Sequence, residues 1–192
     1  MNFLLSKNSN LATLFALLLL LSGCSSFGIK QNPENIDWSF SGKMAIRNAT
    51  EATSFSAQWQ QLGAAYNIRL YGPFGAGEIT IEGRPGNVTL QQGSDVMSSY
   101  SLNDLVYQAT NMDLPLDYLQ YWVRATPAPK QSFNLTKDTF GHVTEIEQAG
   151  WTVSITDYFD EVPPRPRKLS FVKAQDSGKL IIREWNTLPL TE

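Results

Sequence analysis

Apolar and polar side chains alternate along residues 38–90, and this alternation predicts a series of short β-strands. Every second residue is apolar in each segment, which is the period-2 pattern of a strand with one buried face. The segments are residues 38–47, 55–59, 66–70, 78–82 and 88–90. Because short turns join them, the strands should pair antiparallel, as a curved meander with one apolar and one polar face.

Two short amphipathic helices are predicted to follow this first group of strands. Ser101 is a suitable N-cap, with Asp104 three residues later, and Leu102, Leu105, Val106 and Ala109 form a helical stripe. Pro115 is suited to open the second helix. The apolar face of that helix would comprise Leu116, Leu119, Trp122 and Val123, and Pro127 and Pro129 would end it. Helices inserted into a sheet in this way should lie across its apolar face.

Strand patterns resume after the helices and continue to the end of the domain. The segments are residues 132–137, 143–147, 151–155, 169–171 and 180–185, with a proline-rich loop at 162–166. In total the pattern predicts about eleven strands and two main helices. A chain of this length suits one domain with a good core.

The N-terminal region has the pattern of a signal peptide. Lys7 precedes an apolar run at residues 11–21, which is too short to span a bilayer as a stable helix. The run closes on Leu21-Ser22-Gly23-Cys24, which resembles the bacterial lipobox, so residues 1–23 should be removed. Cys24 would then become the first residue, carrying an N-acyl chain and an S-diacylglycerol group. The alternative is an ordinary secretory signal followed by a free thiol.

The residues that follow Cys24 predict a tether and a location. Residues 24–37 lack apolar periodicity and contain Ser, Gly, Asn and Pro, so we interpret them as a flexible link to a single domain at 38–192. Ser25 stands where an aspartate would hold such lipoproteins in the inner membrane. By that resemblance, the protein is expected in the outer membrane, facing the periplasm.

Composition and charge exclude several classes of protein. The formal net charge is −3, and the only loose basic cluster, at residues 165–168, lies among prolines, so nucleic acid is not an expected partner. Cys24 is the only cysteine, which excludes a disulfide within the domain.

The sequence offers no catalytic constellation and no metal or cofactor site. His142 is the single histidine and follows Gly141 in an expected hairpin turn, so we interpret it as an exposed turn residue. Glu78 and Glu82 lie on one strand face, about 13 Å apart at 3.3 Å per residue, which exceeds the spacing in glycosidases. We therefore predict that the protein is not an enzyme and needs no cofactor.

Apolar side chains are the remaining candidates for function. Five tryptophans, ten phenylalanines and seven tyrosines suit either a filled core or a half-barrel with an apolar hollow, and patterning leaves both open. A second feature is Phe74, which lies between Pro73 and Gly75 at the tip of a predicted loop. Either its side chain folds back onto the sheet, or it protrudes as a wedge into a bilayer or a partner.

Several of these segments together resemble the LolB family of outer-membrane lipoprotein receptors. The resemblance covers about residues 38–185. It is carried by the first strand at 38–46, the strand at 55–59, Pro73-Phe74-Gly75 leading to Glu78, the turn at 84–88, and Leu114-Pro115-Leu116 followed by Leu119 and Trp122.

The resemblance implies a mainly β (α+β) fold and a transfer function. The fold would be an open antiparallel β-barrel of about eleven strands, with two or three short helices as a lid over an apolar cavity. A monomer would accept acylated lipoproteins from the periplasmic carrier LolA and release them into outer-membrane lipid. The position of Phe74 is typically leucine in the family and serves membrane insertion. Phenylalanine is a departure that keeps size and apolarity.

Strand alternation then assigns the residues expected to line the acyl-chain cavity. These are Phe40, Met44, Ile46, Phe55, Trp59, Ile68, Leu70, Ile79 and Ile81, capped by Leu105, Leu119 and Trp122. A one-residue error in register would invert a whole strand. Two alternatives remain: a LolA-like carrier, which tethering through Cys24 disfavours, and a structural or assembly lipoprotein with a filled core that binds protein partners.

Overall fold

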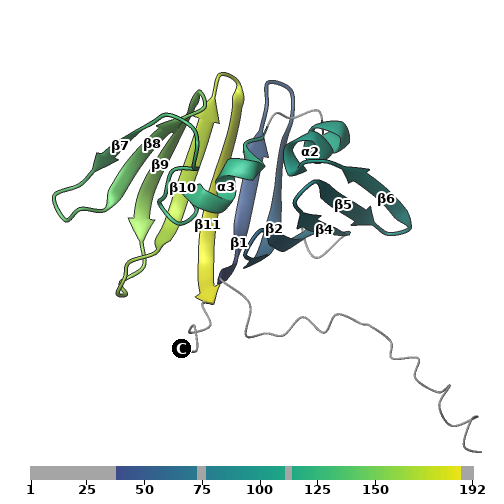
Figure 1. Ribbon diagram of the computed structural model, residues 1–192, viewed down its shortest axis with the longest axis horizontal. Helices are drawn as coiled ribbons and strands as arrows, with labels where there is room; N and C mark the ends of the chain where they lie inside the picture. Colours follow the sequence, from purple (N-terminus) through teal and green to yellow (C-terminus); the bar gives the residue numbers. More distant parts are fainter. Residues whose placement is uncertain (1–37, 73–76, 111–113, 187–192) are drawn as a thin grey trace, which may run out of the picture. The chain divides into compact units, whose positions relative to one another are not determined.

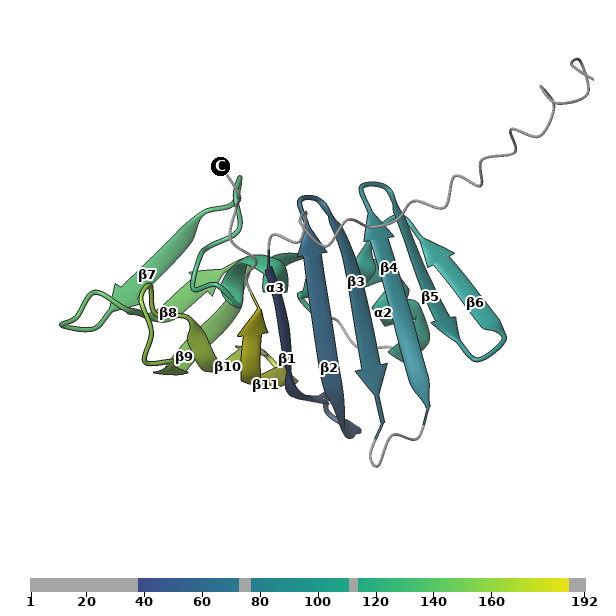
Figure 2. The same ribbon diagram turned by 90° about the horizontal axis from the view of Figure 1, so that it is seen from below.

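A computed structural model describes residues 38–72, 77–110 and 114–186 of the chain. The described strands form one antiparallel sheet in the order β6-β5-β4-β3-β2-β1-β11-β10-β9-β8-β7 (Figures 1 and 2). They are β1 (Trp38–Arg47), β2 (Ala52–Leu62), β3 (Ala65–Tyr71), β4 (Glu78–Arg84), β5 (Asn87–Gln92), β6 (Asp95–Ser99), β7 (Phe133–Lys137), β8 (Val143–Gln148), β9 (Trp151–Tyr158), β10 (Pro166–Lys173) and β11 (Asp176–Asn186). The predicted open antiparallel sheet of about eleven strands is confirmed.

The sheet consists of two meanders joined by its first and last strands. β1 to β5 pair in sequence order, as predicted, and β6 extends this meander; β7 to β11 also pair in sequence order. β1 then pairs antiparallel with β11, from Ser39 opposite Asn186 to Arg47 opposite Ser177. Strands β6 and β7 lie at the two ends of the strand order, so the sheet does not close on itself.

Strand β6 was not predicted from the sequence. Its two apolar residues, Val96 and Met97, are adjacent rather than alternating, so the segment lacks the period-2 pattern. The strand forms because a turn at Gly93, with φ of 60°, lets residues 95–99 pair with β5. Val96 remains exposed, which is consistent with a strand at the edge of the sheet.

The two described helices begin where the sequence predicts. In α2 (Leu102–Thr110), the Ser101 hydroxyl accepts a hydrogen bond from the backbone N–H of Asp104 at 3.1 Å. α3 (Leu116–Trp122) begins directly after Pro115. It ends before the prolines expected to stop it, because Ala125 adopts a left-handed conformation with φ of 54°. Within the described residues, no helix has the length and apolarity needed to cross a membrane.

The inner face of β8 to β11 is filled with tightly packed side chains. Phe171, Leu180 and Ile182 are completely buried there. Above them, Trp122 of α3 donates its indole N–H to Oε1 of the buried Gln148 at 3.0 Å. Gln148 also exchanges two hydrogen bonds of 2.8 Å with the backbone of Ala128. This half of the sheet therefore has a continuous core that α3 and the segment after it complete.

His142 lies in the connection between β7 and β8, as predicted, but it is half-buried rather than exposed. Its ring stacks on Tyr158 with the centroids 5.0 Å apart, and its Nδ1 lies 3.3 Å from the Asp138 carboxylate. Asp138 also accepts hydrogen bonds from the backbone N–H groups of Phe140 and His142. These contacts give His142 a local role in holding the turn.

Candidate functional site

A cavity of about 430 Å³ lies on the inner face of the other half of the sheet. It is lined by Phe40, Met44, Ile46, Thr53, Ser54, Phe55, Ala57, Trp59, Ile68, Leu70, Gly72, Gly77, Ile79, Ile81, Leu90, Gln92, Met97, Val106, Leu114 and Leu116. Strands β1 to β6 form its floor and walls. Part of α2, Leu114 and the start of α3 cover it (Figure 1).

All nine strand residues predicted to line a cavity lie around this one. Strict alternation brings them to one face, because the cross-strand register pairs inner residues with inner residues, as in Phe40 opposite Trp59 and Ile68 opposite Ile81. Alternation also accounts for Leu90, which the prediction left out although the strand at 88–90 was recognised.

The three helical residues predicted to cap the cavity do not line it. Leu105, Leu119 and Trp122 are completely buried, and Trp122 belongs to the filled half of the sheet. Val106, Leu114 and Leu116 face the cavity instead. The prediction was wrong because helical periodicity shows which stripe is buried but not which part of the sheet that stripe contacts.

The hollow coincides with small residues on the inner face. Gly42 pairs with Ala57, between the aromatic pair Phe40–Trp59 and the pair Met44–Phe55. A Cβ atom at Gly42 would come within 2.5 Å of the carbonyl oxygen of Ile181, so the close approach of β11 requires glycine here. Ala57, opposite Gly42, is the small residue that lines the cavity between the larger Phe55 and Trp59.

One end of the cavity is closed by aromatic side chains. Trp38, Phe40, Trp59 and Trp185 form a cluster with ring centroids 5.5–6.2 Å apart. The buried indole N–H of Trp59 donates to Oε1 of Gln61 at 2.9 Å, and that of Trp185 donates to the carbonyl oxygen of Pro166 at 2.9 Å. Ligands cannot pass this end without breaking the packing.

The opposite end of the cavity is lined by its polar residues and by two glycines. Thr53 and Ser54 lie at the start of β2, Gln92 ends β5, and Gly72 and Gly77 flank the connection between β3 and β4. We call this end the mouth. The predicted insertion residues Pro73, Phe74 and Gly75 fall in that connection but lie outside the described residues, as does Cys24.

The lining contains no ionisable group with a charge at neutral pH. Beside the closed end, burial and the Asp117 carboxylate raise the pKa of Tyr66, so its hydroxyl stays neutral. No group of three or more His, Cys, Asp or Glu side chains able to hold a metal occurs in the described part of the chain. This arrangement suits an apolar, uncharged ligand.

Comparisons with known proteins agree with these features. The family model described as "Outer membrane lipoprotein LolB" matches residues 36–185. The chain is 32% identical to the outer-membrane lipoprotein LolB of Halorhodospira halophila over 183 residues, covering 88% of this chain and 90% of that protein. It is 36% identical to that of Cellvibrio japonicus over 155 residues, covering 77% and 76%.

Solved structures show the same fold. A LolA superfamily protein from Nitrosomonas europaea superposes with a TM-score of 0.51 at 14% identity, covering 83% of this chain and 89% of that one. A putative outer membrane lipoprotein-sorting protein domain from Vibrio parahaemolyticus gives a TM-score of 0.51 at 11% identity, covering 81% and 86%. At these identities the likeness concerns the fold alone. The sequence matches, by contrast, establish that this chain belongs to the LolB family of outer-membrane lipoproteins.

Proposed function

We propose that this protein accepts the acyl chains of lipoproteins from a soluble LolA-like periplasmic carrier and inserts those lipoproteins into the outer membrane. The observation that carries the proposal is the uncharged apolar cavity, closed by aromatic rings at one end and bordered by polar residues at its mouth. Acyl chains need a dry concave surface and no precise polar recognition. Family membership supports the coarser role in lipoprotein localisation.

The proposal places the domain at the inner leaflet of the outer membrane, facing the periplasm. Removal of residues 1–23 would leave Cys24 with an N-acyl chain and an S-diacylglycerol group. At about 0.8 kcal/mol per buried CH₂, several chains anchor a protein stably. Residues 25–37 span at most about 40 Å when extended, which lets a single domain turn its mouth toward either the carrier or the bilayer.

Transfer by this protein requires no covalent step. Each CH₂ group that leaves water for an apolar surface gains about 0.8 kcal/mol. Cargo therefore moves spontaneously if its affinity increases from carrier to cavity to bilayer.

The proposed binding of acyl chains in the cavity is tested by filling it with a bulky side chain. Ala57→Trp places a large ring among the lining residues, whereas Gln58→Trp places the same ring on the outer face, because neighbouring strand residues point to opposite sides. In a soluble variant with Cys24→Ala, we expect Gln58→Trp to take radiolabelled lipoprotein from the loaded carrier and Ala57→Trp to take little. Equal uptake by both variants would contradict the proposed site.

The insertion step is tested at Phe74, in the connection between β3 and β4. We propose that Phe74 enters the bilayer in the place of the leucine usual in the family. Phe74→Glu should leave uptake from the carrier intact and block delivery to liposomes, whereas Phe74→Leu should deliver normally. Normal delivery by the glutamate variant would exclude this role.

A further inference from the structure

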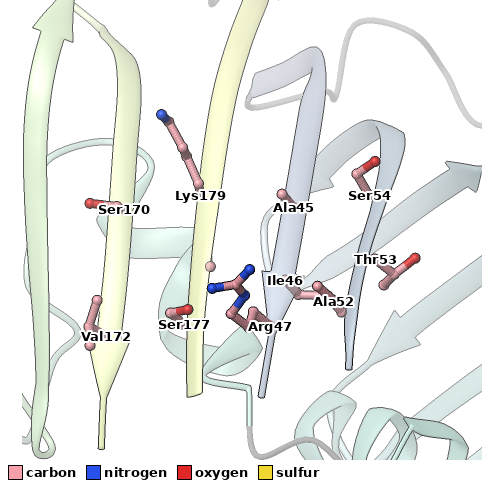
Figure 3. A pocket seen from close by; sticks show the side chains of 11 residues that line it. Ala45, Ile46, Arg47, Ala52, Thr53, Ser54, Ser170, Val172, Ser177 and Lys179 are labelled. Carbon is pink, nitrogen blue, oxygen red and sulfur yellow. The ribbon is translucent and has the colours of Figure 1, made fainter. Parts of the chain in front are cut away.

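A second hollow, of about 560 Å³, lies on the outer face of the sheet near the mouth of the cavity (Figure 3). It is formed by the ends of four neighbouring strands, β2, β1, β11 and β10. The cross-strand register places its outward-facing residues in two rows. One row contains Ser54, Ala45, Lys179 and Ser170, and the next contains Ala52, Arg47, Ser177 and Val172.

The hollow follows from the sizes of these side chains. Alanine and serine occupy most of the positions, so the surface dips between the longer Arg47 and Lys179. These two residues are diagonal neighbours on β1 and β11, which puts their backbones about 7–8 Å apart. Figure 3 shows the side chains of Lys179 and Arg47 on these adjacent strands, with Ser177 beside Arg47 and Ser170 and Ser54 on the flanking strands.

No carboxylate lies within ion-pair distance of either cation in the described part of the chain. Arg69, Arg165 and Lys168 each lie within ion-pair distance of an acidic side chain. Among the described residues, Arg47 and Lys179 form no such pair, and the residues that line the hollow include no Asp or Glu. The acidic Glu51, in the β1–β2 connection, and Asp176, the first residue of β11, lie outside the lining.

The serine hydroxyls of the hollow are also available to a ligand. Within the described ranges, no side-chain hydrogen bond involves the hydroxyl of Ser54, Ser170 or Ser177. All three residues are at least partly exposed. The hollow thus offers two positive charges and three hydroxyl donors on a rigid sheet, which is the set of groups that a phosphate oxygen accepts from.

The hollow and the cavity mouth lie at the same end of the sheet. Arg47 and Ala52 border the β1–β2 turn, and Ser177 follows the β10–β11 turn. Both turns lie at the end of the sheet where the β3–β4 connection borders the mouth, as the alternating strand directions require. Thr53 and Ser54 line both depressions.

We propose that this outer hollow binds the phosphate group of a membrane lipid headgroup. The choice of a lipid rests on the proposed function, because a cavity that releases acyl chains into a bilayer must bring its mouth to the headgroup layer. Arg47 would contact the phosphate through its planar guanidinium and Lys179 as a point charge. Holding headgroups at this end orients the mouth toward the bilayer, although the chain as a whole is acidic.

The experiment measures binding of the mature chain with Cys24→Ala to sedimented vesicles of phosphatidylethanolamine and phosphatidylglycerol at low salt. The variant R47Q/K179Q is compared with R84Q/K137Q, which removes the same charge at the opposite end of the strands, from two exposed residues. One basic side chain near an anionic bilayer strengthens binding about five-fold, so R47Q/K179Q should bind about 25-fold more weakly. The R84Q/K137Q control should change binding less than about two-fold.

Several outcomes would overturn the proposal. Equal losses in the two double variants would mean that only net charge matters. Unchanged vesicle binding with lost uptake from the carrier would assign the hollow to a protein partner. If inorganic phosphate stabilises the wild type but not R47Q/K179Q, and vesicle binding is equal in both, the site binds free phosphate. Binding of a fluorescent fatty acid in the cavity serves as the folding control for each variant. Failure of the wild type to take up cargo would refute the proposed function without affecting the vesicle result.

Discussion

Gln61 and Gln148 are the buried polar side chains of the described core, and each accepts a hydrogen bond from a tryptophan indole. Burying an indole without a partner is costly, so a large aromatic core of this kind requires matched acceptors. Gln61 serves Trp59 at the closed end of the cavity. Gln148 serves Trp122 and also holds the backbone of Ala128, so it joins α3 and the following segment to β8.

Replacing Gln148 with methionine keeps the volume but removes three hydrogen bonds. The indole N–H of Trp122 and the N–H and C=O of Ala128 would remain buried without partners. We expect a loss of about 2–4 kcal/mol in the free energy of unfolding, measured by urea denaturation. Gln60→Met, at an exposed outer position, should stay within about 0.5 kcal/mol, and an equally small effect of Gln148→Met would contradict this role.

At the scale of elements, α2 and α3 cap one another. The backbone N–H of Asp117 in α3 donates to Oδ1 of Asn103 in α2 at 3.0 Å. The Asp117 carboxylate in turn accepts hydrogen bonds from the backbone N–H groups of Leu102 and Asn103. The helix beside the cavity is thereby linked to the helix of the filled half, which is fixed through Trp122.

The reciprocal cap predicts a pH dependence. Burial is the largest effect on Asp117 and raises its pKa above the ordinary value of 3.8, despite the hydrogen bonds that lower it. The folded state binds the Asp117 proton more tightly than the unfolded state does. The protonated carboxyl therefore contributes its full stabilisation below the unfolded pKa, and this contribution is lost as pH rises through the folded pKa. Asp117→Asn, which can still accept hydrogen bonds, should lose this dependence and be at least as stable as wild type at neutral pH. Asp117→Ala should be less stable than the wild type by about 1 kcal/mol. Thermal denaturation across the pH range measures the stability of the wild type and both variants, and an alanine variant as stable as the asparagine variant would contradict the cap.

At the scale of the whole described domain, one sheet carries two different interiors. Side chains from β8 to β11 pack together under α3, whereas those of β1 to β6 leave a cavity beneath α2 and Leu114. The pairing of β1 with β11 makes the two halves one continuous sheet. The filled half can therefore supply stability while the hollow half remains available to a ligand.

A ligand in the hollow half should stabilise the fold. A fatty acid at one hundred times its dissociation constant would add about 2.7 kcal/mol to the free energy of unfolding, which calorimetry would detect as a higher Tm. Ala57→Trp should remove this increase, and Gln58→Trp should retain it. An increase of the same size in both variants would place the ligand elsewhere on the protein.

The faces of the strands could be predicted from the amino-acid pattern, because side chains alternate with a period of two and one assigned residue fixes the face of every other residue in its strand. That is why the nine predicted strand residues, from Phe40 to Ile81, surround one cavity. The amino-acid pattern also predicted the helix starts at Ser101 and Pro115, where local capping chemistry decides. Family membership, too, could be inferred from the order and spacing of its segments.

Which half of the sheet is hollow could not be predicted, because it depends on contacts between distant segments. Burial does not distinguish the helical residues that line the cavity, Val106 and Leu116, from those that pack outside it, Leu105, Leu119 and Trp122. The difference arises because the placement of a helix depends on contacts that are distant in sequence. The edge strand β6 likewise exists through its pairing with β5. The outer hollow required the β1–β11 register, which brings Arg47 and Lys179 together from positions more than a hundred residues apart in the chain.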